Sequence, residues 1–241
     1  MSWQPSIFNI PFFYDGNSEK GVLAIARIAD LPAFWDNDYA KLLSAEELER
    51  IRSIQSEKVK RQYCFGRILT KKALAVLIGE FAFSDVSILN EKSGCPIIIP
   101  SGLGYATSIT HSNEIVASFV FKNCFSFGID VENLRETALE ALASVALAQE
   151  PVPRDLKNLT IAWTLKESLS KALKSGFRLP FSEFEISSFV QNEDIFSCSY
   201  KRYPDFQGIA LFDGKNSFAF TYPKKVSVAA EYFNEFLNYF K

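Results

Sequence analysis

The chain contains the hexapeptide Phe83-Ser84-Asp85-Val86-Ser87-Ile88, and a similar one further on, Phe181-Ser182-Glu183-Phe184-Glu185-Ile186. Both read Phe-Ser-acid-apolar-polar-Ile. Each copy follows a predicted long helix and opens a strand-rich run. One short match can arise by chance, but its agreement with the order of the predicted elements favours a repeated half.

The sequence around these copies predicts three helices, each with its own end signals. The capping-box pattern Ser44-Ala45-Glu46-Glu47 begins the first helix, which ends near Ile54. The second runs from about Ser56 to Ile78 and stops at Gly79. The third runs from about Leu156 to Lys174 and is ended by Gly176. Short β-rich stretches fill most of the rest, at 86–89, 97–99, 105–109, 115–121, 126–131, 184–189, 195–200, 207–212, 217–222 and 227–233.

The repeat and the element order together predict an α+β fold of two pseudo-symmetric halves. We place the N-terminal half at residues 1–125 and the C-terminal half at 126–241. A site for a large ligand is expected in the cleft between them.

Composition narrows the function classes. The chain has 241 residues, a net charge of −2 and a hydrophobic fraction of 48%, which is typical of an ordinary globular protein. This charge gives no general attraction to nucleic acid or to a membrane surface. Its four cysteines are far apart, which argues against a zinc site or a disulfide framework, and no apolar run is long enough to span a bilayer. We therefore expect a cytoplasmic protein.

Two carboxylates, Asp130 and Glu132, lie at the end of the predicted strand Phe127-Gly128-Ile129-Asp130. Side chains two apart on a strand point the same way, so these two repel each other unless a cation or solvent intervenes. A solvated strand end is one interpretation. The other is a Mg²⁺ site, because Mg²⁺ takes a few carboxylates and completes its shell with water and phosphate.

The third helix has two faces. Its core side consists of Ile161, Ala162, Leu165, Leu169 and Ala172. Trp163, Glu167 and Lys171 recur at i, i+4 and i+8 on the other side. Glu before Lys at this spacing is a favourable surface pair, but a large aromatic side chain on a polar face usually contacts something. The face is thus either open surface or the wall of a cleft.

His111, the one histidine, lies in a polar turn of hydroxyls and amides that would suit phosphate oxygens. A plain surface histidine is the alternative. The second helix is the most basic stretch of the chain, with Lys58, Lys60, Arg61, Arg67, Lys71 and Lys72. Without a positive net charge, a phosphate-rich small molecule is a better partner for this helix than a polymer.

Taken in order, these segments resemble the Sfp-type 4'-phosphopantetheinyl transferases. The resemblance covers roughly residues 44–186. Its segments are Arg61 with Phe65-Gly66-Arg67-Ile68-Leu69, Gly94-Cys95-Pro96, Ser108-Ile109-Thr110-His111-Ser112, Phe127-Gly128-Ile129-Asp130-Val131-Glu132 and Trp163-Thr164-Leu165-Lys166-Glu167-Ser168-Leu169-Ser170-Lys171. The last two are the most specific.

The resemblance implies an enzyme that moves 4'-phosphopantetheine from coenzyme A to a serine of an apo acyl or peptidyl carrier protein, acting as a monomer. It implies Mg²⁺, or alternatively Mn²⁺, on Asp130, Glu132 and Glu167. It also implies catalytic roles for Glu167 and Lys171. Coenzyme A would contact the set Arg61, Cys95, Thr110, His111, Lys166 and Lys171.

The chain departs from the family pattern in three places. Gly94-Cys95-Pro96 replaces the usual Gly-Lys-Pro, and Ser108 stands where Asn is usual. The family's aromatic-rich helix corresponds here to residues 145–150, in a short segment. Two other function classes remain: a non-catalytic module that binds coenzyme A or a carrier protein, and a metal-dependent nucleic-acid phosphodiesterase. The intact carboxylates argue against the first, and the near-neutral charge against the second.

Overall fold

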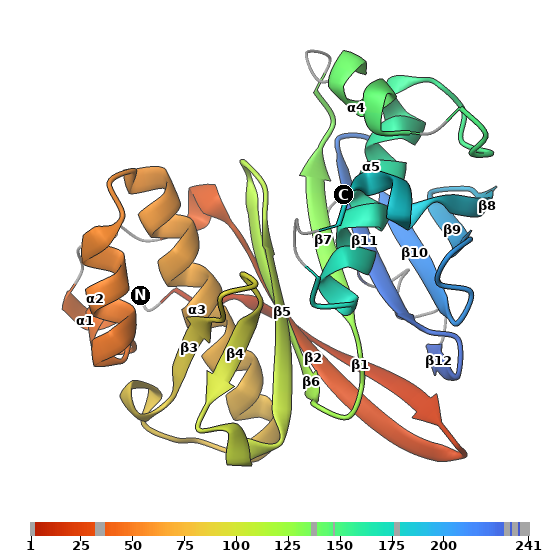
Figure 1. Cartoon of the computed structure of the whole chain (residues 1–241). Coiled ribbons are helices and arrows are strands. Elements are labelled where there is room, and N and C mark those ends of the chain that lie inside the picture. The colour runs from red at the N-terminus through yellow and green to blue at the C-terminus, as the bar shows by residue number, and fades with distance from the viewer. Residues whose placement is uncertain are drawn as a thin grey trace. The chain divides into compact units, whose positions relative to one another are not determined.

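The computed structural model describes residues 3–31, 37–135, 139–146, 148–175, 179–228, 232 and 236. Two compact units make up the chain (Figure 1). Unit 1 comprises Met1–Ile10 and Lys20–Phe125, and unit 2 comprises Pro11–Glu19 and Ser126–Lys241. The sequence predicts that Pro11–Glu19 belongs to the first half. It groups with unit 2 because the end of β1 (Ser6–Tyr14) pairs antiparallel with β12 (Val226–Val228).

Unit 1 packs helices against an antiparallel sheet in which β1, β2 (Asn17–Arg27), β6 (Ile115–Lys122) and β5 (Tyr105–His111) lie in that order. A separate hairpin consists of β3 (Ser87–Asn90) and β4 (Pro96–Ile99). Helix α3 (Glu57–Ile78) packs on β6 and β5, and Phe65, Ile68 and Leu69 on this helix have no exposed surface. The shorter helices are α1 (Asn37–Ala40), α2 (Ala45–Ser53), η1 (Ile28–Asp30), η2 (Phe83–Asp85) and η3 (Ser101–Leu103).

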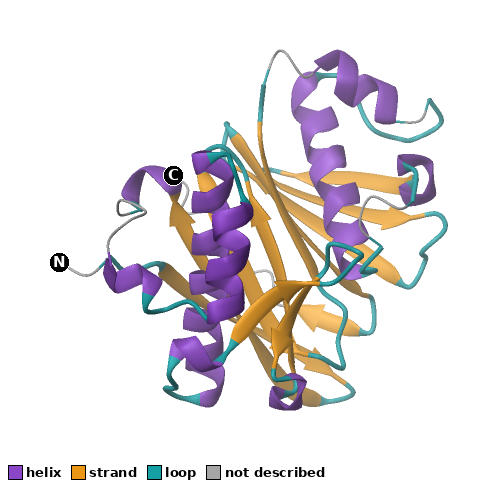
Figure 2. Cartoon of the chain, turned by 60° about the vertical axis from the view of Figure 1, so that its left-hand side comes forward, coloured by secondary structure: helices purple, strands orange, loops and turns teal. Residues whose placement is uncertain are grey.

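Unit 2 has a five-stranded antiparallel sheet in the order β7-β11-β10-β9-β8. Helix α5 (Leu156–Ala172) packs on β7, β11 and β10, as Figure 2 shows for one face of this sheet. The predicted core side of α5 is confirmed, because its five apolar residues are all at most 3% exposed. The strands are β7 (Gly128–Asn133), β8 (Ile186–Asn192), β9 (Ile195–Tyr200), β10 (Phe206–Phe212) and β11 (Asn216–Pro223), with α4 (Leu139–Val145) and η6 (Phe181–Phe184) beside them.

The two units repeat one element order, which confirms the predicted duplication. Each has a strand, a long helix, a 3₁₀ turn and then four strands, the last of which pairs antiparallel with the first. The 3₁₀ turns η2 and η6 are formed by the repeated hexapeptides. A buried hydroxyl pair joins helix to strand in both units, namely Thr70 with Ser118 at 2.7 Å and Ser168 with Thr221 at 2.6 Å.

The capping residues predicted from the sequence set the ends of helices α2 and α3 in unit 1. Ser44 caps α2 in a complete capping box with Glu47, and α3 ends at Gly79 with a φ of 90°. Helix α5 ends at Ala172, earlier than predicted, and Gly176 lies outside the described residues. The last predicted strand is described only as β12, because most of 229–233 also lies outside them. Among the described helices, none is both long and apolar enough to cross a membrane.

Candidate active site

A glycine lets strand β7 approach helix α5 very closely. A Cβ atom on Gly128 would overlap the carbonyl oxygen of Ser168 and lie 2.5 Å from the amide nitrogen of Ala172. Only a residue without a side chain allows this contact. The close approach places the residues that follow Gly128 on β7 beside the C-terminal half of α5.

Asp130 of β7 and Lys171 of α5 form an ion pair at this junction. The Lys171 ammonium donates to Asp130 Oδ1 over 2.6 Å. The Asp130 side chain is 6% exposed, whereas that of Lys171 is 28% exposed. The pair therefore lies at the edge of the core, with the lysine within reach of solvent or of a ligand.

Glu132 and Glu167 interact electrostatically with Asp130 and Lys171, and we call the three acids Asp130, Glu132 and Glu167 the carboxylate cluster. Burial, followed by the negative charge of Asp130, raises the pKa of each glutamate to about 7. Lys171 opposes the rise in both cases but does not cancel it. The charge of Asp130 therefore disfavours ionisation of both glutamates, and the charge of Glu132 also disfavours ionisation of Glu167.

Trp163 lies one turn of α5 before Glu167, on the same side of the helix, and it contacts the cluster. Its side chain hydrogen-bonds the Glu132 carboxylate, which lowers the pKa of that group and so opposes the effect of burial. The Trp163 ring stacks on Phe181, with ring centroids 4.4 Å apart. The predicted face of Trp163, Glu167 and Lys171 is thus in contact with the carboxylates of β7, and it is not open surface.

Three oxygen-donor side chains with excess negative charge are the kind of ligand set that Mg²⁺ takes in proteins. The donor chemistry of Asp130, Glu132 and Glu167 therefore fits a magnesium ion. Among the residues that the structure describes, however, no three acidic, cysteine or histidine side chains are already gathered as a metal site. Lys171 is the cation that contacts Asp130 here.

Lys166, although next to Glu167 in sequence, lies elsewhere. Its ammonium group is 2.6 Å from Glu150 Oε1, and both side chains are at most 1% exposed. The structure therefore places Lys166 in the core of unit 2 and does not bring it to the carboxylate cluster. This position argues against a direct contact between Lys166 and coenzyme A.

The candidate residues of unit 1 lie on α3 and β5. Arg61 donates to the carbonyl oxygen of Leu31. Thr110 and His111 are neighbours on β5, where successive side chains point to opposite faces. Thr110 is buried and His111 is exposed. The strand continues through His111, so this residue precedes the turn, which differs from the prediction, and the two side chains do not share a face.

Cys95 lies in the turn of the β3–β4 hairpin and is half-buried. Its amide donates to Ser93 Oγ over 3.3 Å, and its carbonyl accepts from the amide of Glu91 over 2.9 Å. Gly94 before it has a φ of 88°, a conformation that favours glycine. The turn is therefore fixed by its backbone, and the Cys95 side chain is not part of the core.

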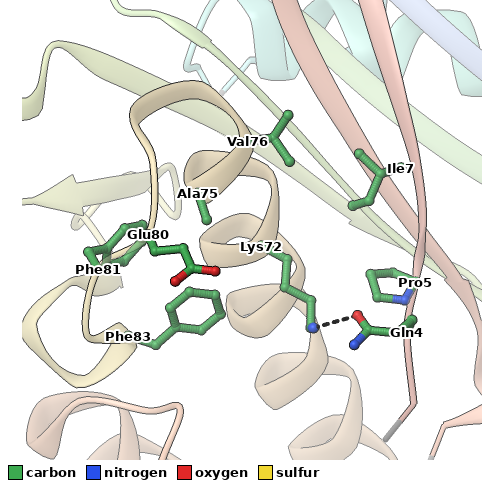
Figure 3. A pocket seen from close by; sticks show the side chains of 9 residues that line it. All are labelled: Gln4, Pro5, Ile7, Lys72, Ala75, Val76, Glu80, Phe81 and Phe83. Atoms are coloured by element: carbon green, nitrogen blue, oxygen red, sulfur yellow. Dashed lines mark hydrogen bonds between the residues drawn. The ribbon is translucent and has the colours of Figure 1, made fainter.

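Unit 1 also has a pocket of about 340 Å³ between β1 and α3 (Figure 3). Its lining is mostly apolar. Lys72 enters it and donates to the side chain of Gln4 over 2.9 Å. Partial burial lowers the pKa of this lysine. None of the predicted site residues lines this pocket.

Comparison with known proteins identifies the family. The sequence profile of the 4'-phosphopantetheinyl transferase superfamily matches residues 126–210, which lie in unit 2. The chain is 33% identical over 85 residues to the holo-[acyl-carrier-protein] synthase of Staphylococcus haemolyticus (strain JCSC1435), which covers 33% of this chain and 71% of that protein. The chain belongs to the 4'-phosphopantetheinyl transferase superfamily.

Other members of the superfamily match in a similar way. The holo-[acyl-carrier-protein] synthase of Staphylococcus carnosus (strain TM300) is 29% identical over 104 residues, which is 41% of this chain and 89% of that protein. A solved holo-(acyl-carrier-protein) synthase from Bacillus anthracis str. Ames, in complex with CoA (3',5'-ADP), has a TM-score of 0.38 at 19% identity, covering 48% of this chain and 97% of that one. The Sfp-type subgroup stays a prediction.

Two residues that shape unit 2 around the candidate site have no sufficient signal in the sequence. Gly128 belongs to the motif of β7, but the motif does not show that its missing side chain permits the contact between β7 and α5. Glu150 lies in the segment 145–150, which departs from the family pattern. A buried acid partner for Lys166 has no local sequence signal, because the two residues meet only in the folded unit.

Proposed function

We propose that this chain transfers the 4'-phosphopantetheine group of coenzyme A to a serine of an apo acyl or peptidyl carrier protein and releases 3',5'-ADP. Mg²⁺ held by Asp130, Glu132 and Glu167 is part of this proposal. The support comes from superfamily membership together with the carboxylate cluster around Lys171 in unit 2.

The carboxylate cluster can perform the steps that this reaction needs. The serine hydroxyl oxygen attacks the β-phosphorus of coenzyme A, and the bond from this phosphorus to the oxygen of 3',5'-ADP breaks. A bound Mg²⁺ would polarise the phosphoryl oxygens and neutralise charge on the pyrophosphate. Lys171 is half-exposed beside Asp130 and would stabilise the departing phosphate electrostatically.

Glu167 is the group we propose to accept the serine proton, directly or through water. A general base works best when its pKa is near the operating pH. Burial and the charge of Asp130 raise the pKa of Glu167 to about 7 in the metal-free chain. A bound cation would lower this pKa, so that the carboxylate is ionised at neutral pH.

We further propose roles for unit 1 on the basis of the Sfp-type resemblance. Arg61 and His111 would bind phosphate groups of coenzyme A, with Thr110 and Cys95 near its nucleotide. The exposure of His111 is compatible with this role. Thr110 is buried, so it would act through its backbone or after a local rearrangement.

Mass spectrometry of candidate carriers tests the proposal. The protein is incubated with coenzyme A, Mg²⁺ and several apo acyl and peptidyl carrier proteins, and each carrier is weighed. We expect a phosphopantetheine adduct on at least one carrier, and no adduct when its acceptor serine is replaced by alanine. Coenzyme A binding without any adduct would favour the non-catalytic module. The absence of both coenzyme A binding and adduct would rule out the transferase and the module alike.

A further inference from the structure

Glu150 and Lys166 form a buried ion pair in unit 2 that the proposed chemistry does not use. Their charged atoms are 2.6 Å apart, and the side chains are 0% and 1% exposed. Burial lowers the pKa of Lys166, and the charge and hydrogen bond of Glu150 oppose this effect. The Glu150 carboxylate thus favours the charged form of the lysine, against the effect of burial.

This pair connects three segments of unit 2. Glu150 precedes α5, Lys166 is on α5, and the same Glu150 oxygen also accepts the amide of Ile186 over 2.9 Å. Ile186 is the first residue of β8 and the last residue of the second hexapeptide. The carboxylate therefore ties the helix to the edge strand of the sheet.

A buried ion pair is a poor means of gaining stability, because removing two charges from water costs about as much as their attraction returns. Well-packed apolar side chains can do as well. Such a pair does constrain geometry, since a charge-assisted hydrogen bond restricts the positions and orientations of both partners more than an apolar contact does.

Lys166 lies immediately before Glu167 on α5, and the residue after Glu167 is also anchored. Ser168 Oγ is 2.6 Å from Thr221 Oγ1 of β11 and donates to the carbonyl oxygen of Leu165. Glu167 is thus flanked on both sides by side chains that hold this turn of the helix against the sheet. A small rotation of the turn would move the Glu167 carboxylate relative to Asp130.

Unit 1 contains a corresponding connection on a helix where the residue after the lysine is not an acid. Lys71 of α3 is 2.6 Å from Glu47 Oε2, both side chains are fully buried, and Glu47 Oε1 accepts the amide of Ile88 over 2.7 Å. Ile88 ends the first hexapeptide, as Ile186 ends the second. The residue after Lys71 is Lys72, so this copy flanks no acid on its helix.

We propose that Glu150 and Lys166 are positioning residues that hold the Glu167 carboxylate in its place for phosphopantetheine transfer. This inference rests on the proposed function. The pair of unit 1 separates positioning from plain stabilisation, because it makes the same ion pair and the same contact with an isoleucine amide on a helix that has no proposed base. Glu47 also caps α2 through the amide of Ser44, so this pair contributes to stability at least as broadly as the pair of unit 2 does.

The test compares two double variants, Glu150→Gln with Lys166→Met and Glu47→Gln with Lys71→Met. Each removes both charges and leaves an acceptor for the isoleucine amide. We measure kcat and KM for coenzyme A at saturating Mg²⁺ and carrier, well below the Tm of each variant. The unit 2 variant should lose about 10- to 100-fold in kcat with little change in KM, since small misplacements of a catalytic group cost this much. The unit 1 variant should keep its kcat within about twofold of the wild type, even if its Tm falls as much as the Tm of the unit 2 variant.

Equal losses of kcat in both variants, or an unchanged kcat in the unit 2 variant, would overturn the proposal. Should the unit 2 double variant fail to fold, Lys166→Arg serves instead, because it keeps the charge but moves the donor. If the wild type modifies no carrier, the proposed function fails. Crystal structures of the wild type and the unit 2 variant then decide the inference. A Glu167 carboxylate displaced from Asp130 supports it, and one left in place contradicts it.

Discussion

At the scale of single residues, environment decides what each charge on α5 can do. Lys166 and Lys171 are both on this helix, yet one is enclosed with Glu150 and the other is half-exposed beside Asp130. The sequence grouped them because both match family positions. It could not separate them, since the partner of Lys166 is contributed by a different segment of the chain.

Replacing Glu167 by glutamine tests the proposed base. Removing a positioned general base typically costs about 10²- to 10⁴-fold, so kcat of Glu167→Gln should fall by at least about 100-fold. The fold should survive, because the lost carboxylate is one whose ionisation its neighbours oppose. Steady-state kinetics with a carrier substrate and circular dichroism check the two expectations.

An exposed helical acid provides the control for this variant. Glu49→Gln on α2 changes the net charge equally and should leave kcat unchanged. Near wild-type turnover of Glu167→Gln would remove Glu167 from the mechanism.

Replacing Cys95 by lysine tests the nucleotide side. Cys95 is half-buried in a turn fixed by its backbone, so a longer side chain can extend to solvent. A lysine would add a positive charge near the phosphates of coenzyme A, and an exposed charge contact contributes about 0.2 to 1 kcal/mol. We expect KM for coenzyme A to fall up to several-fold with kcat unchanged, and the gain to shrink as salt rises. An unchanged KM together with an unchanged Tm would place this turn away from the nucleotide.

At the scale of elements, local signals were sufficient for helices but not for their contacts. The capping box at Ser44 and the glycine after Ile78 determine α2 and α3 through residues adjacent in sequence, and both predictions are confirmed. The two-residue spacing of Asp130 and Glu132 gave one face of β7. The distance of that strand from α5 could not be predicted, because it depends on a side chain that Gly128 lacks.

Gly128→Ala should therefore separate the strand from the helix. The new methyl group would meet backbone atoms of Ser168 and Ala172, which cannot move as a flexible side chain would. We expect a clearly lower Tm and a loss of transfer of about 100-fold or more, because the Asp130–Lys171 contact depends on this approach. Differential scanning calorimetry and the carrier assay measure both.

Gly102→Ala is the matched control for this prediction. A Cβ at Gly102 has no atom within 4 Å, and the residue lies in the short η3 turn of unit 1. Its Tm and activity should stay close to those of the wild type. Wild-type behaviour of Gly128→Ala would mean that β7 and α5 are not as close in solution.

At the scale of the whole molecule, the sequence predicted the duplication from six residues, and the structure extends it to a full element order. The hexapeptides lie where each unit turns from its long helix into its sheet, and the last residue of each donates its amide to a buried glutamate. Carboxylates that repel one another lie on β7 and α5 of unit 2. In unit 1 the corresponding first strand is β2, and its buried residues 21–26 are all apolar or glycine. The two units therefore differ in the charge of this strand but share the same order of elements.

The carboxylate cluster makes the stability of the whole chain depend on pH. Native Glu132 and Glu167 have a pKa of about 7, raised from 4.5 by burial and by Asp130. Between about pH 4.5 and pH 7 the native state keeps protons that the unfolded state has released. Rising pH therefore favours unfolding in this window. We expect the Tm of the metal-free protein to fall from pH 5 to pH 8, as followed by calorimetry in EDTA.

Magnesium should reverse this fall, because a ligand that binds only the folded state raises the free energy of unfolding. Its carboxylate ligands must be ionised, so millimolar Mg²⁺ should raise the Tm at pH 8 far more than at pH 5. The variant Glu132→Gln with Glu167→Gln should show a flatter pH profile and little response to Mg²⁺. Carboxyls with a lowered pKa, such as Asp155, lose their stabilising effect only at lower pH and do not disturb this range. A wild-type Tm that is the same at pH 5 and pH 8, and that Mg²⁺ leaves unchanged at pH 8, would contradict both the raised pKa values and the proposed metal site.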